Sequence, residues 1–189
     1  AQWRSLWVTV DASLLPPGDS EFTLKTFNDE GAALAAFRLP VRVLPQALPP
    51  QTLYQTQWFH ADCLADYYQV PVFSEEHWCI LDNFIGSAAA HGINMLLTPV
   101  FTPPLDTAKG GERTTVQLVE VNWDGTDYHF DFARLRRWVE LCRKHGITEI
   151  EVSHLFTQWG AICAPKIWVN TPDGPEKRFG WHTPAVGGE

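Results

Sequence analysis

The residues best suited to chemistry lie at the ends of three short apolar segments, residues 52–60, 93–98 and 147–154. Five polar or aromatic side chains end or follow these segments: His60, Asp62, Thr98, His154 and Trp159. Imidazole, carboxylate and hydroxyl groups exchange hydrogen bonds with hydroxyl-rich ligands, and an indole face stacks on flat apolar surfaces. We predict that all five bind a substrate.

Two of these residue types also suggest other chemistry. His60 and Asp62 have the His-x-Asp spacing of two metal ligands, but one such pair is weak evidence. Hydrogen bonds to a substrate or to neighbouring loops explain the pair as well. His154 has the side chain of a general base. No Ser or Cys nucleophile pattern surrounds it, so a substrate contact or a structural role is favoured. We predict no metal and no cofactor.

Other candidates leave alternatives open. Trp159 and Trp168 either stack on a ligand or cover the rim of the fold. Asp106, Glu112 and Glu120 are loop carboxylates, and nothing in the sequence pairs two of them for acid–base catalysis. No catalytic residue is therefore assigned in this chain.

The tripeptide His-Gly-Ile occurs twice, and each copy joins a predicted helix to a predicted strand. Residues 74–92 and 131–146 carry apolar side chains at intervals of three and four, which is typical of helices with one buried face. In the first helix these positions are Trp78, Leu81, Phe84, Ile85 and Ala88. Gly92 and Gly146 stand where a helix ends in a left-handed residue. The histidine before each glycine fits this capping pattern rather than catalysis.

A helix followed by a strand after one glycine is half of a β-α-β unit, so the three apolar segments are expected to form parallel strands. Alternating apolar residues upstream predict antiparallel strands at 6–12, 21–27 and 34–44. A complete barrel takes about 250 residues. The predicted fold class is therefore α/β. It comprises the last strands of a β-sandwich domain (residues 1–48) and a partial (β/α)8 barrel (residues 49–189), formed by its first three β/α units.

Two connections have their own signals. Residues 114–132 alternate around Asp124-Gly125, which predicts a β-hairpin with a two-residue turn. Because this hairpin lies in the second β-α connection, we expect it on the rim that carries the site. Residues 170–189 are rich in Pro and Gly and predict a loop.

Composition excludes several classes of protein. The formal net charge is −8, and no Lys/Arg cluster is present, so nucleic acid is not an expected partner. No apolar run is long enough for a membrane span, and no membrane partner is expected. The four cysteines are widely separated, with no Cys-x-x-Cys pair. They fit a reducing, cytoplasmic compartment better than a disulfide framework.

Several long blocks of the sequence resemble a known bacterial family. They are WFHADCLADYY, FSEEHW, HGINMLLTPVFTPPLDT, GGERTTVQLVEV and SHLFTQWGAICAPKIWV. These blocks are similar to proteins related to glycoside hydrolase family 123, whose characterised members are β-N-acetylgalactosaminidases. The resemblance covers essentially the whole chain, including the strands that precede the predicted barrel.

The resemblance implies a β-sandwich followed by a (β/α)8 barrel that cleaves a terminal N-acetylhexosamine with retention. It also implies substrate assistance, in which the acetamido oxygen of the sugar attacks the anomeric carbon. An adjacent Asp-Glu pair on a later barrel strand orients the acetamide and supplies the general acid. Such substrate assistance is a recognised exception to catalysis by two carboxylates.

That catalytic pair is absent from this sequence. The only adjacent Asp-Glu is Asp29-Glu30, in a predicted turn of the β-sandwich. We therefore expect a catalytically inactive fragment of a glycoside hydrolase, whose partner is a carbohydrate that contains N-acetylhexosamine. The alternatives are a non-catalytic carbohydrate-binding protein with the same fold and a structural barrel that binds no sugar. Because the last barrel strand would have an open edge, we also expect the fragment to self-associate.

Overall fold

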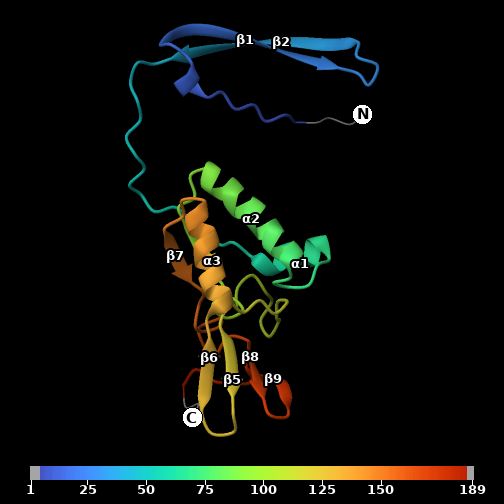
Figure 1. Ribbon diagram of the computed structural model, residues 1–189, viewed down its shortest axis with the longest axis vertical. Coiled ribbons are helices and arrows are strands. Elements are labelled where there is room, and N and C mark those ends of the chain that lie inside the picture. The colour runs from blue at the N-terminus through green and yellow to red at the C-terminus, as the bar shows by residue number, and fades with distance from the viewer. Residues whose placement is uncertain (1–4, 187–189) are drawn as a thin grey trace. The chain divides into compact units, whose positions relative to one another are not determined.

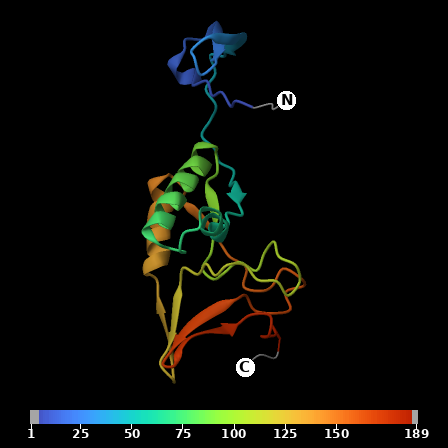
Figure 2. The same ribbon diagram turned by 90° about the vertical axis from the view of Figure 1, so that its right-hand side faces the viewer.

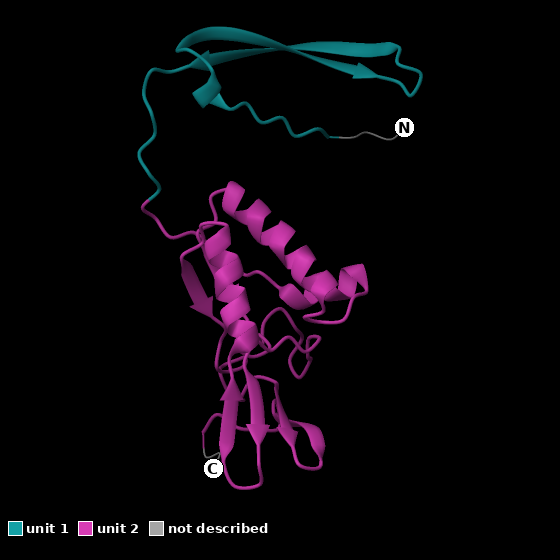
Figure 3. Cartoon of the chain, in the orientation of Figure 1, with its two compact units in different colours: residues 1–51 teal, residues 52–189 magenta. Residues whose placement is uncertain are grey.

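The computed structural model describes residues 5–186. The chain divides into two compact units, Ala1–Gln51 and Thr52–Glu189 (Figure 3). The sequence places this division after residue 48. Each unit is described by itself below.

The first unit contains one antiparallel hairpin, formed by β1 (Gly18–Phe27) and β2 (Ala33–Val43). Its turn is closed by Asn28, whose side-chain oxygen accepts hydrogen bonds from the backbone N–H groups of Glu30 and Ala32. The strand predicted at 6–12 is wrong. The 3-10 helix η1 (Ala12–Leu14) follows Asp11, which accepts the N–H of Ser13, and such local bonds compete with strand pairing.

The second unit contains the predicted parallel sheet, with strand order β3–β4–β7 (Figure 1). The strands are β3 (Thr56–Gln57), β4 (Met95–Thr98) and β7 (Glu149–Val152), and both pairings are parallel. The prediction of three parallel strands is confirmed, although each strand is shorter than its apolar segment.

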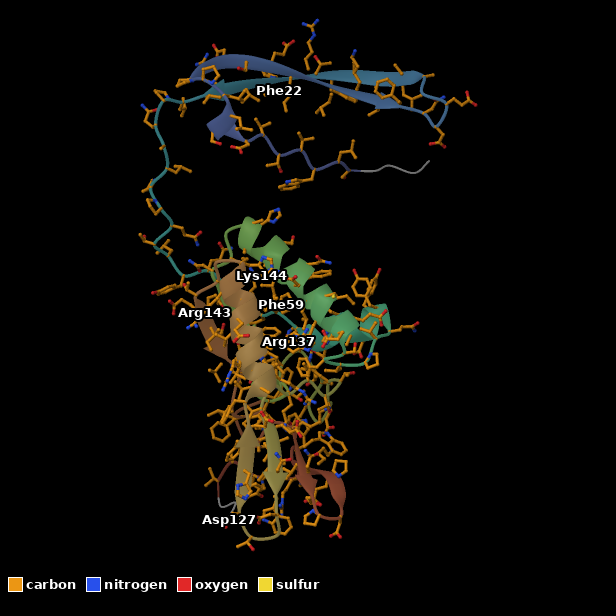
Figure 4. All side chains as sticks on the ribbon, viewed as in Figure 1. Phe22, Phe59, Asp127, Arg137, Arg143 and Lys144 are labelled. Atoms are coloured by element: carbon orange, nitrogen blue, oxygen red, sulfur yellow. The ribbon has the colours of Figure 1, made fainter. Side chains whose placement is uncertain are left out.

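Three helices accompany this sheet: α1 (Ala61–Tyr68), α2 (Glu75–Ala90) and α3 (Ala133–Lys144). Ser74 caps α2 by accepting the N–H of His77 at 3.2 Å. Arg143 and Lys144 lie in the last turn of α3, where cations stabilise the helix dipole, and Figure 4 shows them far from Asp127 in the β5–β6 turn. The sequence analysis did not predict α1.

The two His-Gly-Ile copies form the same helix end. The N–H of Ile93 bonds to the carbonyl of Ala88, and the N–H of Ile147 bonds to that of Cys142. The glycines between them have φ of 86° and 81°, as predicted for a left-handed C′ residue.

The hydrophobic core lies between the parallel sheet and the helices. Its buried members include Trp78, Leu81, Ile85, Leu96, Trp138, Cys142 and Ile147. Phe84 does not belong to the core. It is 41% exposed and meets Tyr68 of α1 edge to face. This corrects the predicted apolar stripe.

A second sheet has the order β6–β5–β8–β9 and lies at the end of the second unit where α3 begins (Figures 1 and 2). The predicted hairpin is confirmed as β5 (Glu120–Trp123) and β6 (Tyr128–Asp131). The loop predicted at the end of the chain is wrong. β8 (Ile167–Thr171) and β9 (Gly174–Phe179) form a hairpin there, and β8 pairs with β5 in parallel. Asp173-Gly174 was the missed turn signal, with φ of 119° at Gly174.

One buried histidine holds α1 and α2 together. The Nε2 of His77 lies 2.9 Å from the carbonyl oxygen of Ala61, and its Nδ1 accepts the N–H of Phe73 at 2.9 Å. Nε2 therefore donates, and the ring is neutral. Burial lowers the pKa of His77 below its ordinary value of 6.5, and the Ala61 carbonyl and the Asp62 charge only partly oppose this.

We expect the free energy of unfolding to decrease as the pH falls below about 6.5. The unfolded chain then binds a proton that folded His77 does not, so the contribution is fully present above that pH and lost below it. Urea unfolding at about pH 8 and pH 5 measures the change. His77→Gln keeps a donor and an acceptor but does not titrate, so its pH dependence should be weaker than that of the wild type. Equal pH dependence in both proteins would contradict this assignment.

Candidate active site

The loops that follow the three parallel strands meet at the carboxyl end of the sheet. His60 follows β3, Asp106 follows β4 and Gln158 follows β7. The Nε2 of His60 lies 2.6 Å from Oδ2 of Asp106. The backbone N–H of Asp106 donates to Oε1 of Gln158 at 3.0 Å. One side chain from each loop therefore takes part in a single hydrogen-bonded row.

This row fixes which ring nitrogen of His60 donates to Asp106. Because a carboxylate only accepts hydrogen bonds, Nε2 carries the proton that points to Asp106. The other ring nitrogen, Nδ1, is buried and has no hydrogen-bond partner among residues 5–186. The row thus joins three loops that lie far apart in the sequence, and Nδ1 of His60 stays a buried ring nitrogen without a partner in the described part of the chain.

Aromatic residues flank the row. The indole N–H of Trp159 donates to the carbonyl of Thr107 at 3.1 Å, which ties the loop after β7 to the loop after β4. Its ring is 47% exposed. Trp58 and His154 meet edge to face, with 5.7 Å between ring centroids. Both tryptophans combine a fixed position with an accessible face.

An open depression of about 450 Å³ lies among these loops. It is lined by Trp58, Leu105, His154, Phe156, Gln158 and Gly160, together with their neighbours. Ligand pockets typically enclose about 300–1,000 Å³ and combine apolar walls with a few polar groups. The depression therefore has the size and composition for a small polar ligand such as one sugar ring.

The predicted site residues divide into two groups. His154 lines the depression, whereas His60 and Trp159 lie in the same loops but are not among its lining residues. Thr98 does not reach it: the side chain is fully buried, accepts the indole N–H of Trp138 at 3.2 Å and lies 3.2 Å from the carbonyl of Leu96. Asp62 is also buried, in the ion pair described next.

Asp62 and Arg113 form a buried bidentate ion pair. Nε and Nη2 of Arg113 donate to the two carboxylate oxygens at 2.8 and 3.3 Å. The side chains are 3% and 9% exposed. Nη1 of Arg113 also donates to the carbonyl of Leu105 at 3.2 Å. Leu105 lines the depression and precedes Asp106, so this ion pair braces the loop that carries Asp106.

The two residues of the predicted His-x-Asp pair do not share a partner. Asp62 is bonded to Arg113 and His60 to Asp106. Within residues 5–186 no group of three or more His, Cys, Asp or Glu side chains could hold a metal ion. In the same range, no helix has the length and hydropathy needed to cross a membrane.

Sequence reasoning missed three contributors. It noted Asp106 only as a loop carboxylate without a partner, and it did not single out Gln158 or Arg113. Their partners lie 46 to 52 residues away in the sequence. Local spacing carries no signal for such pairings.

Residues 58–186, more than half of the chain, match the family described as the catalytic domain of glycoside hydrolase 123. The chain belongs to glycoside hydrolase family 123. No curated protein matches the sequence significantly.

The fold is also similar to a solved family 123 glycoside hydrolase from Clostridium perfringens, described in terms of glycolipid glycan hydrolysis. The TM-score is 0.61 and the sequence identity 17%, with 85% of this chain covered. The match spans only 29% of the Clostridium protein. At this identity the similarity supports the family fold, and the activity of a whole protein has to be argued separately.

We expect Arg113→Met to destabilise the protein by about 3–5 kcal/mol, because it leaves the Asp62 carboxylate buried without a counter-charge. The double variant Asp62→Asn/Arg113→Met removes both charges and should lose less. Urea unfolding measures both.

The control is Arg42→Met, which breaks the exposed Arg42–Asp19 pair of the first unit and should change stability little. A double variant less stable than Arg113→Met alone would show that the unpaired charge is not the cause of the loss.

Proposed function

We propose that this chain forms part of the sugar-binding rim of a glycoside hydrolase that removes a terminal N-acetylhexosamine of the N-acetylgalactosamine type. The observation that carries this proposal is the meeting of three loops at the carboxyl ends of three parallel strands, in a chain of family 123. Active sites of barrel enzymes lie at this end of the strands.

Each group around the depression has a role in this proposal. The exposed face of Trp58, which lines the depression, and that of Trp159, in the loop beside it, stack on the apolar face of a pyranose. His154 and Gln158 exchange hydrogen bonds with its hydroxyl and acetamido groups. Asp106 positions His60 and does not itself act as an acid, because its carboxylate is already an acceptor for His60.

In this proposal the chemical step is retaining and substrate-assisted. The acetamido oxygen attacks the anomeric carbon, the bond to the leaving group breaks, and a general acid protonates the leaving oxygen. The Asp-Glu pair needed for this would lie outside these 189 residues. The only adjacent Asp-Glu here, Asp29-Glu30, lies in the β1–β2 turn of the first unit. The 29% coverage of the Clostridium protein supports a longer parent.

The architecture follows from the same proposal. β3, β4 and β7 would be the first three strands of a (β/α)8 barrel, and the β1–β2 hairpin would be the end of a preceding β-sandwich. The missing carboxylate pair favours one alternative for the chain taken alone, a carbohydrate-binding protein without catalysis.

We expect the whole protein to hydrolyse aryl N-acetyl-β-galactosaminide faster than the corresponding glucosaminide. Trp159→Ala should lower kcat/KM by about tenfold, since a lost stacking contact is worth about 1.4 kcal/mol. The melting temperature should change little because Trp159 is 47% exposed and its lost bond to the Thr107 carbonyl joins two surface loops. The matched control is Phe84→Ala, which removes an exposed aromatic ring from α2. If the whole protein hydrolyses neither substrate, the proposed hydrolase activity is wrong. If Trp159→Ala and Phe84→Ala lower kcat/KM equally, the proposed position of the sugar pocket is wrong.

The edge strand β7 supports a further part of the proposal. Ile150 and Val152 on β7 are 39% and 52% exposed, as expected where the next barrel unit would pack. We expect the isolated 189-residue chain to self-associate, with a sedimentation coefficient that rises with concentration. Ile150→Lys should weaken this association without unfolding the chain, since the side chain is accessible. A monomer at all concentrations would show that the open edge needs no partner.

A further inference from the structure

A second depression, separate from the candidate active site, lies on one face of the β6–β5–β8–β9 sheet. Its volume is about 270 Å³. The residues that matter are Phe73, Gln117, Glu120, Arg134, Trp168 and Asn170. Phe73 immediately precedes α2, and Arg134 lies in the first turn of α3. Because crossover helices begin at the carboxyl ends of the strands they follow, this depression and the active-site loops share one end of the unit.

Planar polar groups are arranged on this sheet face. β5 and β8 pair in parallel with Asn122 opposite Asn170, which places Glu120 and Asn170 on the same face. The amide nitrogen of Asn170 donates at 2.9 Å to Oε1 of Glu120 and at 2.9 Å to the side-chain oxygen of Asn122. The amide is therefore fixed in orientation, with its oxygen left to accept from a ligand.

Arg134 completes the polar set. Its Nη1 lies 3.8 Å from Oε2 of Glu120, and the two side chains are 49% and 40% exposed. One positive and one negative charge balance at this point, so the surface favours neither an anion nor a cation. Carboxylate, amide and guanidinium groups together can bind adjacent hydroxyls of a neutral ligand.

Trp168 presents an accessible indole on a rigid backbone. Its backbone N–H donates to Oε1 of Gln117, and its carbonyl accepts from Nε2 of the same side chain, both at 3.0 Å. Gln117 is buried, yet the Trp168 side chain keeps 39% of its surface exposed. An immobilised backbone with an exposed ring suits stacking, because little freedom is lost when a ligand binds.

Phe73 forms a wall of the depression in a disfavoured backbone conformation. Its φ is 59°, in the left-handed region, where a bulky side chain is strained. The bond to His77 and stacking on Trp78, with 5.3 Å between centroids, hold it there. Strained residues of this kind cluster at functional sites. The Arg134 guanidinium lies 5.6 Å from the Phe73 ring centroid, so the wall also positions the charged group.

We propose that this depression is a second carbohydrate-binding surface, which binds a sugar unit of the glycan beyond the unit that is hydrolysed. The indole of Trp168 stacks on the pyranose, and Glu120, Arg134 and Asn170 bind its hydroxyls. The ligand class is a neutral oligosaccharide. The proposal rests on the proposed function for the identity of the glycan, and on the residues above for the binding itself.

Kinetics of the whole protein on a short and a long substrate test the proposal. The short one is aryl N-acetyl-β-galactosaminide, and the long one is a neutral tetrasaccharide that ends in β-linked N-acetylgalactosamine. Trp168→Ala should lower kcat/KM for the tetrasaccharide about tenfold more than for the aryl glycoside. Asn170→Ala, at an exposed position, should shift the same ratio in the same direction and covers the case in which Trp168→Ala does not fold. An unchanged ratio in both variants would overturn the proposal.

Two controls make the result specific. Glu176 lies on the opposite face of the sheet from Trp168. Glu176→Gln should therefore leave the ratio of the two kcat/KM values as in the wild type. Trp159→Ala should lower kcat/KM for both substrates by the same factor, so its effect differs from that of the Trp168 variant.

A direct binding measurement separates this proposal from the proposed function. If the whole protein hydrolyses neither substrate, the proposed enzyme fails, and calorimetric titration with the tetrasaccharide decides the second surface. Binding by the wild type that is at least about tenfold weaker in Asn170→Ala and Trp168→Ala would support it. No binding by the wild type, or equal binding by all variants, would overturn it.

Discussion

The buried ion pair between Asp62 and Arg113 connects parts of the second unit that the chain itself separates widely. Asp62 lies in the first turn of α1, just after β3, and Arg113 lies in the long segment between β4 and β5. Arg113 also bonds to the carbonyl of Leu105, which precedes Asp106. This one ion pair therefore holds both the loop that carries Asp106 and the segment that leads from β4 to β5. A pair of this kind is stable only while both partners are present, because burial of either charge alone is costly.

In the second unit, the buried core and the polar loops are formed by different parts of the fold. The parallel sheet and its helices form a dry core, centred on Leu96, Leu81 and Trp138. The loops beyond the carboxyl ends of the strands contain hydrogen-bonded rows such as His60–Asp106, where polar side chains lie near solvent. Binding residues on such loops keep a defined position because the sheet and helices beneath them are rigid. The second sheet extends this arrangement, with Gln117 fixing the backbone of Trp168 while its ring stays accessible.

The two depressions share a chemical character. Each combines an exposed tryptophan with a planar amide group, Trp58 with Gln158 in one and Trp168 with Asn170 in the other. Neither contains an adjacent Asp-Glu pair, so recognition and bond cleavage would be carried by different parts of the parent protein. Under the proposed function the chain would select and orient a glycan, and the acetamide-orienting and proton-donating groups would lie outside these 189 residues.

The sequence by itself determined the features that depend on neighbouring residues. The apolar pattern of residues 74–92 predicted α2, Gly92 and Gly146 predicted two helix ends, and Asp124-Gly125 predicted a hairpin, because these signals involve residues that are close in the sequence. The order of three parallel strands also followed, since a helix between strands forces a crossover. Only the tertiary structure decided three contacts: the ion pair of Asp62 with Arg113, the buried hydrogen bond from Trp138 to Thr98, and the parallel pairing of β8 with β5. These contacts link residues about 40 to 51 positions apart, and no local period or spacing specifies which distant groups meet.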